Sequence, residues 1–273
     1  MWPRLAGWQF FASSAVNSSV ATVFVAAGVL AAAHLLPFPV EATREAVCLE
    51  PASRGWPSQT VAAHESPFIG ELLGGFRGPV ADLLWLEANE RAEAGDLPAM
   101  EELLHLVTSV DPQPLYFWLN AVRITAYDVP ACRVASMRDG KALSSFARRR
   151  IEEDQARRAL DLLDEARRYH PACAALWIER ANIQLNRLGD VAGAAESYRR
   201  ASAQPDAPYF AARLHAELLR RLGRKEAALA WLVRLHPTLP PRDEAAGADL
   251  VLSRIRTLEQ ELGVPAERAY HGL

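Results

Sequence analysis

The sequence predicts an all-α protein in which a single transmembrane helix precedes a solenoid of about four helical hairpins and a C-terminal capping helix. Three observations lead to this fold class. Apolar residues recur with helical spacing from residue 79 onward, a set of residues repeats along that region, and no Asp, Glu, Lys or Arg stands between Arg4 and Glu41. The 273 residues are 50% hydrophobic and 23% charged, which is typical of a folded protein rather than a disordered or fibrous one.

The overall charge and the cysteines exclude several classes of function. Thirty Lys and Arg residues against 33 Asp and Glu residues give a net charge of −3, so the chain lacks the basic field of a typical nucleic-acid-binding protein. Cys48, Cys132 and Cys173 are too few and too scattered for a disulfide framework or a CxxC zinc site. We therefore expect no nucleic-acid partner, no cofactor and no metal.

The transmembrane helix is predicted at residues 20–40, within an N-terminal anchor of residues 1–40. This uncharged stretch matches the roughly 20 apolar residues that cross a bilayer, and aromatic residues precede it, as they do at lipid headgroups. A cleaved signal peptide with a small-residue site near Ala31 is the alternative. The only early cation, Arg4, lies far from the apolar run, which favours a retained signal-anchor.

A tether of residues 41–66 and a segment of residues 67–80 join the anchor to the repeats. The tether contains Pro, Gly and Ser residues and no sustained apolar period. Residues 67–80 are expected to form a short helix, PFIGELL, and a Gly-rich turn without the lysine of a phosphate loop. The few cations flanking the span orient it little. A short cytoplasmic tail is the simpler arrangement, and it places the repeats on the extracytoplasmic (periplasmic) side.

A set of small and apolar residues repeats within residues 81–242. Gly189 and Gly223 stand 34 residues apart, and Gly95 heads a third segment. The fifth, ninth and twelfth places after each glycine are small or apolar, and a fourth segment has the same set without a glycine. The four sets are Met100, Leu104 and Val107; Ala159, Leu163 and Ala166; Ala194, Tyr198 and Ala201; and Ala228, Leu232 and Leu235.

This pattern resembles the tetratricopeptide repeat (TPR) family, whose 34-residue unit has a Trp-containing first helix and a second helix with A-x3-F before a proline. The second helices match well. The first helices match more loosely, since Trp177 and Ala181 fit but Gly189 then comes one residue late. The resemblance implies stacked hairpins that bind other proteins. The entry segment from Gly74 to Trp85 is also faintly similar to that of uncharacterised bacterial membrane-anchored TPR proteins, which implies no activity.

A capping helix is predicted in residues 243–273, because a terminal repeat needs a polar outer face. A helix from Asp243 to Gly263 has an apolar and a charged side. The apolar side consists of Leu250, Ile255, Leu258 and Leu262, and the outward side of Arg254, Arg256, Glu259 and Glu261.

The second unit is too long, because Trp118 and Pro171 stand 53 residues apart where a regular unit takes about 28. The extra residues are expected near 128–154, as a loop from Asp128 to Leu143 and a second helix that begins early, near Ser144. Long loops on rigid scaffolds are often functional, although a tolerated surface insertion is the alternative.

The candidate surface of this insertion is basic, and it consists of Arg133, Arg138, Lys141, Arg148, Arg149 and Arg150. One interpretation is that these cations bind an anionic lipid or an acidic partner. The alternative is that the arginines pair with Glu152, Glu153 and Asp154 along the helix, as opposite charges three or four residues apart do.

No catalytic set of residues stands out in the sequence. The seven histidines form no HExxH or HxH motif, GxSxG does not occur, and the carboxylates follow helix surfaces. We therefore do not expect an enzyme. Cys132 and Cys173 are expected at opposite ends of a helix pair, too far apart for a disulfide.

The TPR resemblance implies a partner-binding groove along the first helices. The side chains expected to line it are Trp85, Asn89, Tyr116, Arg123, Tyr127, Asn182, Asn186 and Arg213. Aromatic, Asn and Arg side chains suit a peptide, but packing between first helices is the alternative, above all for Trp85. Trp85 and Leu119 stand where some family members carry a carboxylate-binding lysine, which disfavours a receptor for chaperone tails.

Together these features predict a membrane-anchored scaffold or assembly factor of the bacterial envelope, which presents a TPR-like groove to another protein or peptide segment near the bilayer. The alternative is an envelope enzyme, or its dedicated regulatory subunit, with the 128–154 insertion at its site.

Overall fold

The computed structural model describes residues 74–137 and 143–272. The predicted anchor, tether and PFIGELL helix lie outside these ranges, as do Arg138 and Lys141 of the insertion. Among the residues that are described, no helix has both the length and the apolar character needed to cross a membrane.

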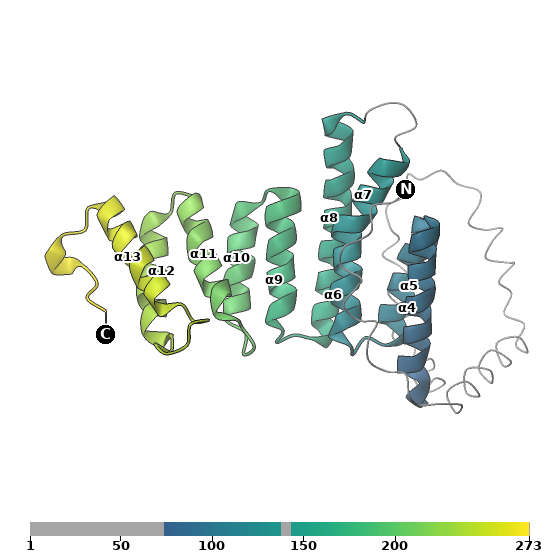
Figure 1. The fold of residues 1–273 in the computed structure, drawn as a ribbon, viewed down its shortest axis with the longest axis horizontal. Coiled ribbons are helices and arrows are strands. Elements are labelled where there is room, and N and C mark those ends of the chain that lie inside the picture. Colours follow the sequence, from purple (N-terminus) through teal and green to yellow (C-terminus); the bar gives the residue numbers. More distant parts are fainter. Residues whose placement is uncertain (1–73, 138–142, 273) are drawn as a thin grey trace, which may run out of the picture. The chain divides into compact units, whose positions relative to one another are not determined.

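The described residues form four helical pairs and a final helix. After the 3-10 turn η2 (Gly74–Phe76), the pairs are α4 (Arg77–Ala94) with α5 (Leu97–Val110), α6 (Leu115–Arg123) with α8 (Ser145–Tyr169), α9 (Ala174–Ile183) with α10 (Val191–Ser202), and α11 (Tyr209–Arg221) with α12 (Lys225–Leu235). The 3-10 turn η5 (His236–Thr238), α13 (Ala248–Leu262) and the 3-10 turn η6 (Ala266–Arg268) follow. Consecutive helices contact one another, so the pairs stand side by side in a row (Figure 1). This confirms the predicted all-α stack of hairpins.

The repeated residues form the core of this stack. Of the twelve, all are buried except Leu235, which is half-buried. Each hydrophobic cluster contains residues of one pair and of the next helix in the row, which is α13 for the last cluster. No pair can therefore bury its apolar faces alone, which is the physical reason why the hairpins stack.

A Gly-Asp dipeptide makes the turn inside two of the pairs. Gly95 and Gly189 end α4 and η4 with positive φ angles of 78° and 66°, a conformation that costs other residues strain. Asp96 and Asp190 then cap the second helices, since their side chains accept the N–H groups of residues 99 and 193 at 3.3 and 2.8 Å.

The late position of Gly189 has a structural cause. The first helix of its unit does not stay α-helical but ends in a π-helical segment, η4 (Gln184–Leu188). The Gly189 N–H donates to the Gln184 carbonyl, one residue further back than in an α-helix. The π turn thus accommodates the extra residue without displacing the helices on either side.

The expectation of a loop from Asp128 to Leu143 is wrong for residues 128–136, which are helical. A second π-helical segment, η3 (Ile124–Asp128), carries α6 directly into α7 (Val129–Ser136). Pro130 stands in the first turn of α7, directly after this π-helical segment. The second helix, α8, begins at Ser145 with the Ser144 hydroxyl as its cap, as the sequence predicts. The insertion therefore lengthens both helices of the pair instead of forming a long loop.

The terminal helix is shorter than expected and is turned differently. α13 begins at Ala248, and its buried side consists of Val251, Ile255 and Leu258. Leu250 is 52% exposed, although it was expected to face inward. Glu259, expected outward, is buried because the chain after α13 folds back over it and the Tyr270 N–H donates to its carboxylate at 2.6 Å.

Candidate functional site

The predicted groove residues at the start of the row pack against one another. Trp85 on α4 is buried, and its ring lies 5.6 Å from that of Tyr116 and 5.7 Å from that of Phe117, both on α6. Tyr116 remains 52% exposed, and Asn89 is half-buried. Trp85 thus supports the neighbouring helix, whereas Tyr116 presents an aromatic surface to solvent.

The predicted residues in the middle of the row make polar contacts between helices, one between two units and one within a unit. The Arg123 guanidinium donates to the buried Glu179 carboxylate of α9 at 3.1 Å. Asn182 accepts a hydrogen bond from the Tyr198 hydroxyl at 2.7 Å. These contacts link neighbouring helices, so the Arg123 guanidinium and the Asn182 carbonyl group already have partners in the folded chain.

The two π-helical segments lie against each other. The Arg187 guanidinium of η4 stacks 4.5 Å above the Tyr127 ring of η3. Burial raises the pKa of Tyr127, the nearby Glu179 charge adds to this effect, and a hydrogen bond with the Asn186 side chain opposes it. Burial likewise raises the pKa of Asp128, and the Arg187 charge opposes that rise. π turns often occur at functional sites, but here they also join two units.

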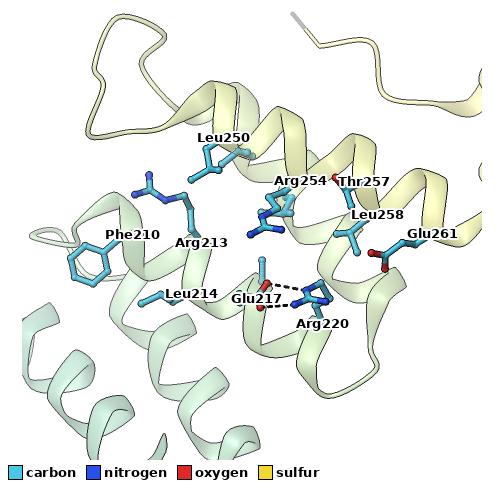
Figure 2. A pocket seen from close by; sticks show the side chains of 13 residues that line it. Phe210, Arg213, Leu214, Glu217, Arg220, Leu250, Arg254, Thr257, Leu258 and Glu261 are labelled. Atoms are coloured by element: carbon cyan, nitrogen blue, oxygen red, sulfur yellow. Dashed lines mark hydrogen bonds and ion pairs between the residues drawn. The ribbon is translucent and has the colours of Figure 1, made fainter. Parts of the chain in front are cut away.

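Arg213 on α11, the last predicted groove residue, holds a loop. Its Nη1 donates to the Ala245 and Ala246 carbonyl oxygens at 3.0 and 2.5 Å. The loop before α13 is therefore tied to α11, and the tie fixes one side of a hollow between these two helices. Figure 2 shows Arg213 beside Leu250 at this edge.

Of the predicted groove residues, only Arg213 lines the hollow between α11 and α13, and sequence reasoning missed the rest of its lining. The hollow has a volume of about 410 Å³, and its floor includes Leu232 and Leu258. Three exposed apolar side chains line it (Figure 2): Phe210, Leu214 and Leu250 are 41%, 36% and 52% exposed. Apolar side chains exposed together around a concave surface are typical of a binding site.

Charged side chains complete this α11–α13 groove. Glu217 accepts two hydrogen bonds from Arg220 at 2.9 and 2.8 Å, and these bonds lower the pKa of its carboxyl group. Arg254 also lines the groove, yet no carboxylate of the described residues lies within ion-pairing distance of it. The groove thus combines an apolar wall with the guanidinium of Arg254, which has no ion pair with the described residues but whose charge helps to lower the pKa of Glu217.

The predicted insertion surface is partly neutralised. Arg133 donates to both oxygens of Glu101 at 2.8 and 3.0 Å, so it ties α7 to α5. Arg149 donates to Glu153 at 2.8 Å, one turn further along α8. Arg148 and Arg150 have no ion pair with the described residues. The helix-pairing interpretation therefore holds for Arg149 but not for its two neighbours.

A second hollow, of about 490 Å³, lies where the start of α8 faces η4. Arg148, Glu152 and Arg187 line it together, so its wall carries both signs of charge. It is more polar and more open than the α11–α13 groove, and we assign no ligand to it.

The comparisons with known proteins give only distant structural likeness. No family model and no curated protein matches the sequence. The structure is similar to that of TTC0263, a thermophilic TPR protein of Thermus thermophilus, with 20% identity and a TM-score of 0.38 over 66% of this chain and 81% of that one. It is also similar to the MamA protein, with 11% identity and a TM-score of 0.36 over 72% of this chain and 99% of that one.

The metal-binding potential, the cysteines and two of the histidines can be described individually. No group of three or more His, Cys, Asp or Glu side chains in residues 74–137 and 143–272 is arranged to hold a metal ion. Cys132 and Cys173 are free thiols, and burial, with the Asp128 charge adding to it, raises the pKa of Cys132 away from that of a reactive thiolate. His170 and His236 make structural contacts, with the Pro112 carbonyl and the Tyr270 hydroxyl.

Proposed function

We propose that the chain is a scaffold that binds a segment of another protein in the α11–α13 groove. The observation that carries this proposal is the gathering of Phe210, Leu214 and Leu250 around one hollow, all exposed to solvent. An isolated exposed leucine needs no explanation, but three large apolar side chains around a cavity favour burial by a partner.

The groove also defines the chemistry of the bound segment. Its apolar wall suits a peptide with large aliphatic or aromatic side chains, which gain most from leaving water. Arg254 favours a carboxylate beside those side chains, because a guanidinium binds carboxylates through paired N–H groups. We therefore propose an apolar segment with an acidic residue as the ligand.

Site-specific photo-crosslinking tests this proposal. A photoreactive residue at Leu214 is expected to capture one recurrent protein from native membranes, and Leu214→Glu with Leu250→Glu is expected to lose that protein. Leu106 on α5 is the matched control, since it is also apolar and 45% exposed but does not line the groove. Equal capture at both positions, or a partner retained by the double variant, would contradict the proposal.

We also propose that residues 20–40 anchor this scaffold in a membrane, with the repeats on the extracytoplasmic side. The support is the sequence itself, an uncharged apolar stretch long enough to cross a bilayer. The full chain is expected to stay in membranes after an alkaline wash, and a chain without residues 20–40 is expected to be released. The side is tested in intact cells by labelling Ser253→Cys, an exposed position on α13, with a membrane-impermeant thiol reagent, in a chain whose three native cysteines are replaced by serine. Absence of labelling, with labelling restored after lysis, would place the repeats in the cytoplasm.

A further inference from the structure

The α7–α8 helix pair extends beyond its neighbours. α8 has 25 residues and α10 has 12, which correspond to lengths of about 37 and 18 Å at 1.5 Å per residue. The first half of α8 pairs with α7, and this part projects past the ends of α9 and α10 (Figure 1). We call its described end, residues 134–137 and 143–150, the hairpin tip.

The hairpin tip exposes large apolar side chains to water. Phe146, the second residue of α8, is 75% exposed, and Met137, which follows α7, is 55% exposed. Neither residue belongs to the hydrophobic clusters that hold the stack together. Phe146 and Met137 therefore contribute little to the stability of the stack. They leave apolar surface exposed on the projecting end of the helix pair.

The hairpin tip is also basic. Arg148, Arg149 and Arg150 lie within the first two turns of α8, and residues 134–137 and 143–150 contain no Asp or Glu. The positive end of the helix dipole is at the same place, where acidic residues are usually found, so the three cations weaken the helix start. Basic residues at a helix N-terminus are unfavourable, and Arg148 and Arg150 have no ion pair with the described residues that would offset this cost. Their presence therefore points to a function other than stabilising the fold.

We propose that the hairpin tip docks on an anionic lipid surface. Phe146 and Met137 enter the boundary between headgroups and acyl chains, and Arg148 and Arg150, which have no ion pair with the described residues, bind lipid phosphates. A fluid bilayer accepts a convex apolar tip without a preformed cavity, whereas a protein partner needs a matching hollow. Charge complementarity at the hairpin tip is local, because the chain as a whole carries a net charge of −3.

This inference is independent of the groove and of the anchor, so its test needs a signal from the hairpin tip alone. The full chain carries Ser145→Cys, with Cys48, Cys132 and Cys173 replaced by serine, and a polarity-sensitive fluorophore on residue 145. Vesicles of phosphatidylcholine are compared with vesicles that also contain phosphatidylglycerol. A chain held on a vesicle by residues 20–40 gives no signal unless the hairpin tip itself enters the lipid.

The expected result is a blue shift of the fluorophore with phosphatidylglycerol vesicles and a much smaller one with phosphatidylcholine. Replacing Arg148 and Arg150 by glutamine is expected to raise the lipid needed for half of the shift on the order of 25-fold, about fivefold for each arginine. Phe146→Ser is expected to weaken the shift as well. A fluorophore at Leu250→Cys on α13 is the control and is expected not to shift.

Two outcomes would overturn the proposal. One is the absence of a shift with phosphatidylglycerol vesicles, or an equal shift with both kinds of vesicle, while circular dichroism shows the helices intact. The other comes from a photoreactive residue at Phe146 in native membranes. A lipid adduct supports the proposal, and a recurrent protein adduct without a lipid adduct shows that the hairpin tip binds an acidic protein instead.

Discussion

Arg123 on α6 and Glu179 on α9 join the first helices of two successive units. Nε and Nη2 of Arg123 each donate to the same carboxylate oxygen of Glu179 at 3.1 Å. The Glu179 side chain is 6% exposed, whereas that of Arg123 is 55% exposed. A carboxylate this deeply buried needs a charged partner, and the guanidinium of the largely exposed Arg123 is that partner.

Replacing Arg123 by alanine is therefore expected to destabilise the stack. The variant leaves the Glu179 carboxylate buried without its cation, which we expect to lower the free energy of unfolding by about 1–2 kcal/mol, less than for a fully buried pair. Urea denaturation followed by circular dichroism measures this loss. Arg91→Ala is the control, because both side chains of its pair with Glu87 are exposed, and water screens such a pair so that its loss is expected to change stability much less. Equal losses in the two variants would show that the buried pair contributes nothing special.

The second prediction concerns the positive φ angle of Gly189, which is expected to make Gly189→Ala less stable than the parent chain. An alanine Cβ at this position meets no atom within 4 Å, so the cost of Gly189→Ala is backbone strain alone, about 1 kcal/mol. Gly75→Ala is the matched control, since its Cβ also meets no atom within 4 Å and its φ lies outside the left-handed region. Urea midpoints that shift equally in the two variants would argue against a strain mechanism.

The sequence predicts the stack well because the repeated residues obey a local rule. Each set lies on one face of a single helix, and burial of that face needs only the next helix along the chain. Leu163 and Ala201, from different sets, are both fully buried as expected. The prediction is less accurate where the chain departs from the α-helical period. The π-helical segments before Val129 and Gly189 leave no signal in composition, and their only signal in spacing is a single extra residue.

The groove is harder to predict because it depends on how two helices face each other. Phe210 and Leu214 are four residues apart on α11, which is also the spacing of a buried face. The apolar pattern of α13 places Leu250 on the buried side, but in the structure the neighbouring Val251 takes that place and Leu250 is exposed. Only the packing of α13, held by the Tyr270 N–H on Glu259 and by Arg213 on the preceding loop, turns these leucines toward a shared hollow.

The core of the extended pair supplies a third prediction. Leu163 on α8 is fully buried among residues of α6 and α9, so Leu163→Ala leaves a cavity between two units and is expected to cost about 2–5 kcal/mol. Leu106→Ala makes the same chemical change on a side chain that is 45% exposed and is expected to stay within about 0.5 kcal/mol. Thermal unfolding of both variants compares them, and similar melting temperatures would mean that the pair is not tightly packed.

His215 makes the last prediction, which concerns pH. This residue of α11 is 6% exposed, its Nδ1 lies 2.7 Å from the Ala195 carbonyl oxygen, and its ring packs 4.5 Å from that of Trp231. Burial lowers the pKa of His215, and the hydrogen bond with Ala195 opposes this without cancelling it. The folded chain therefore holds a neutral imidazole at a pH where the unfolded chain already binds a proton.

The pKa difference of His215 contributes fully to the free energy of unfolding above the pKa of histidine in the unfolded chain, about 6.5. This contribution declines as the pH falls from there toward the lower pKa of the folded chain. His215→Gln is expected to be less stable than the parent chain at neutral pH, because it disturbs the contact with Trp231, but to lose less stability on acidification. Urea denaturation at a series of pH values measures both differences. His271→Gln, in the exposed tail, is expected to keep the parent profile. Parallel profiles for the parent chain and His215→Gln would mean that the buried imidazole is protonated as easily as a free one, in conflict with its contacts.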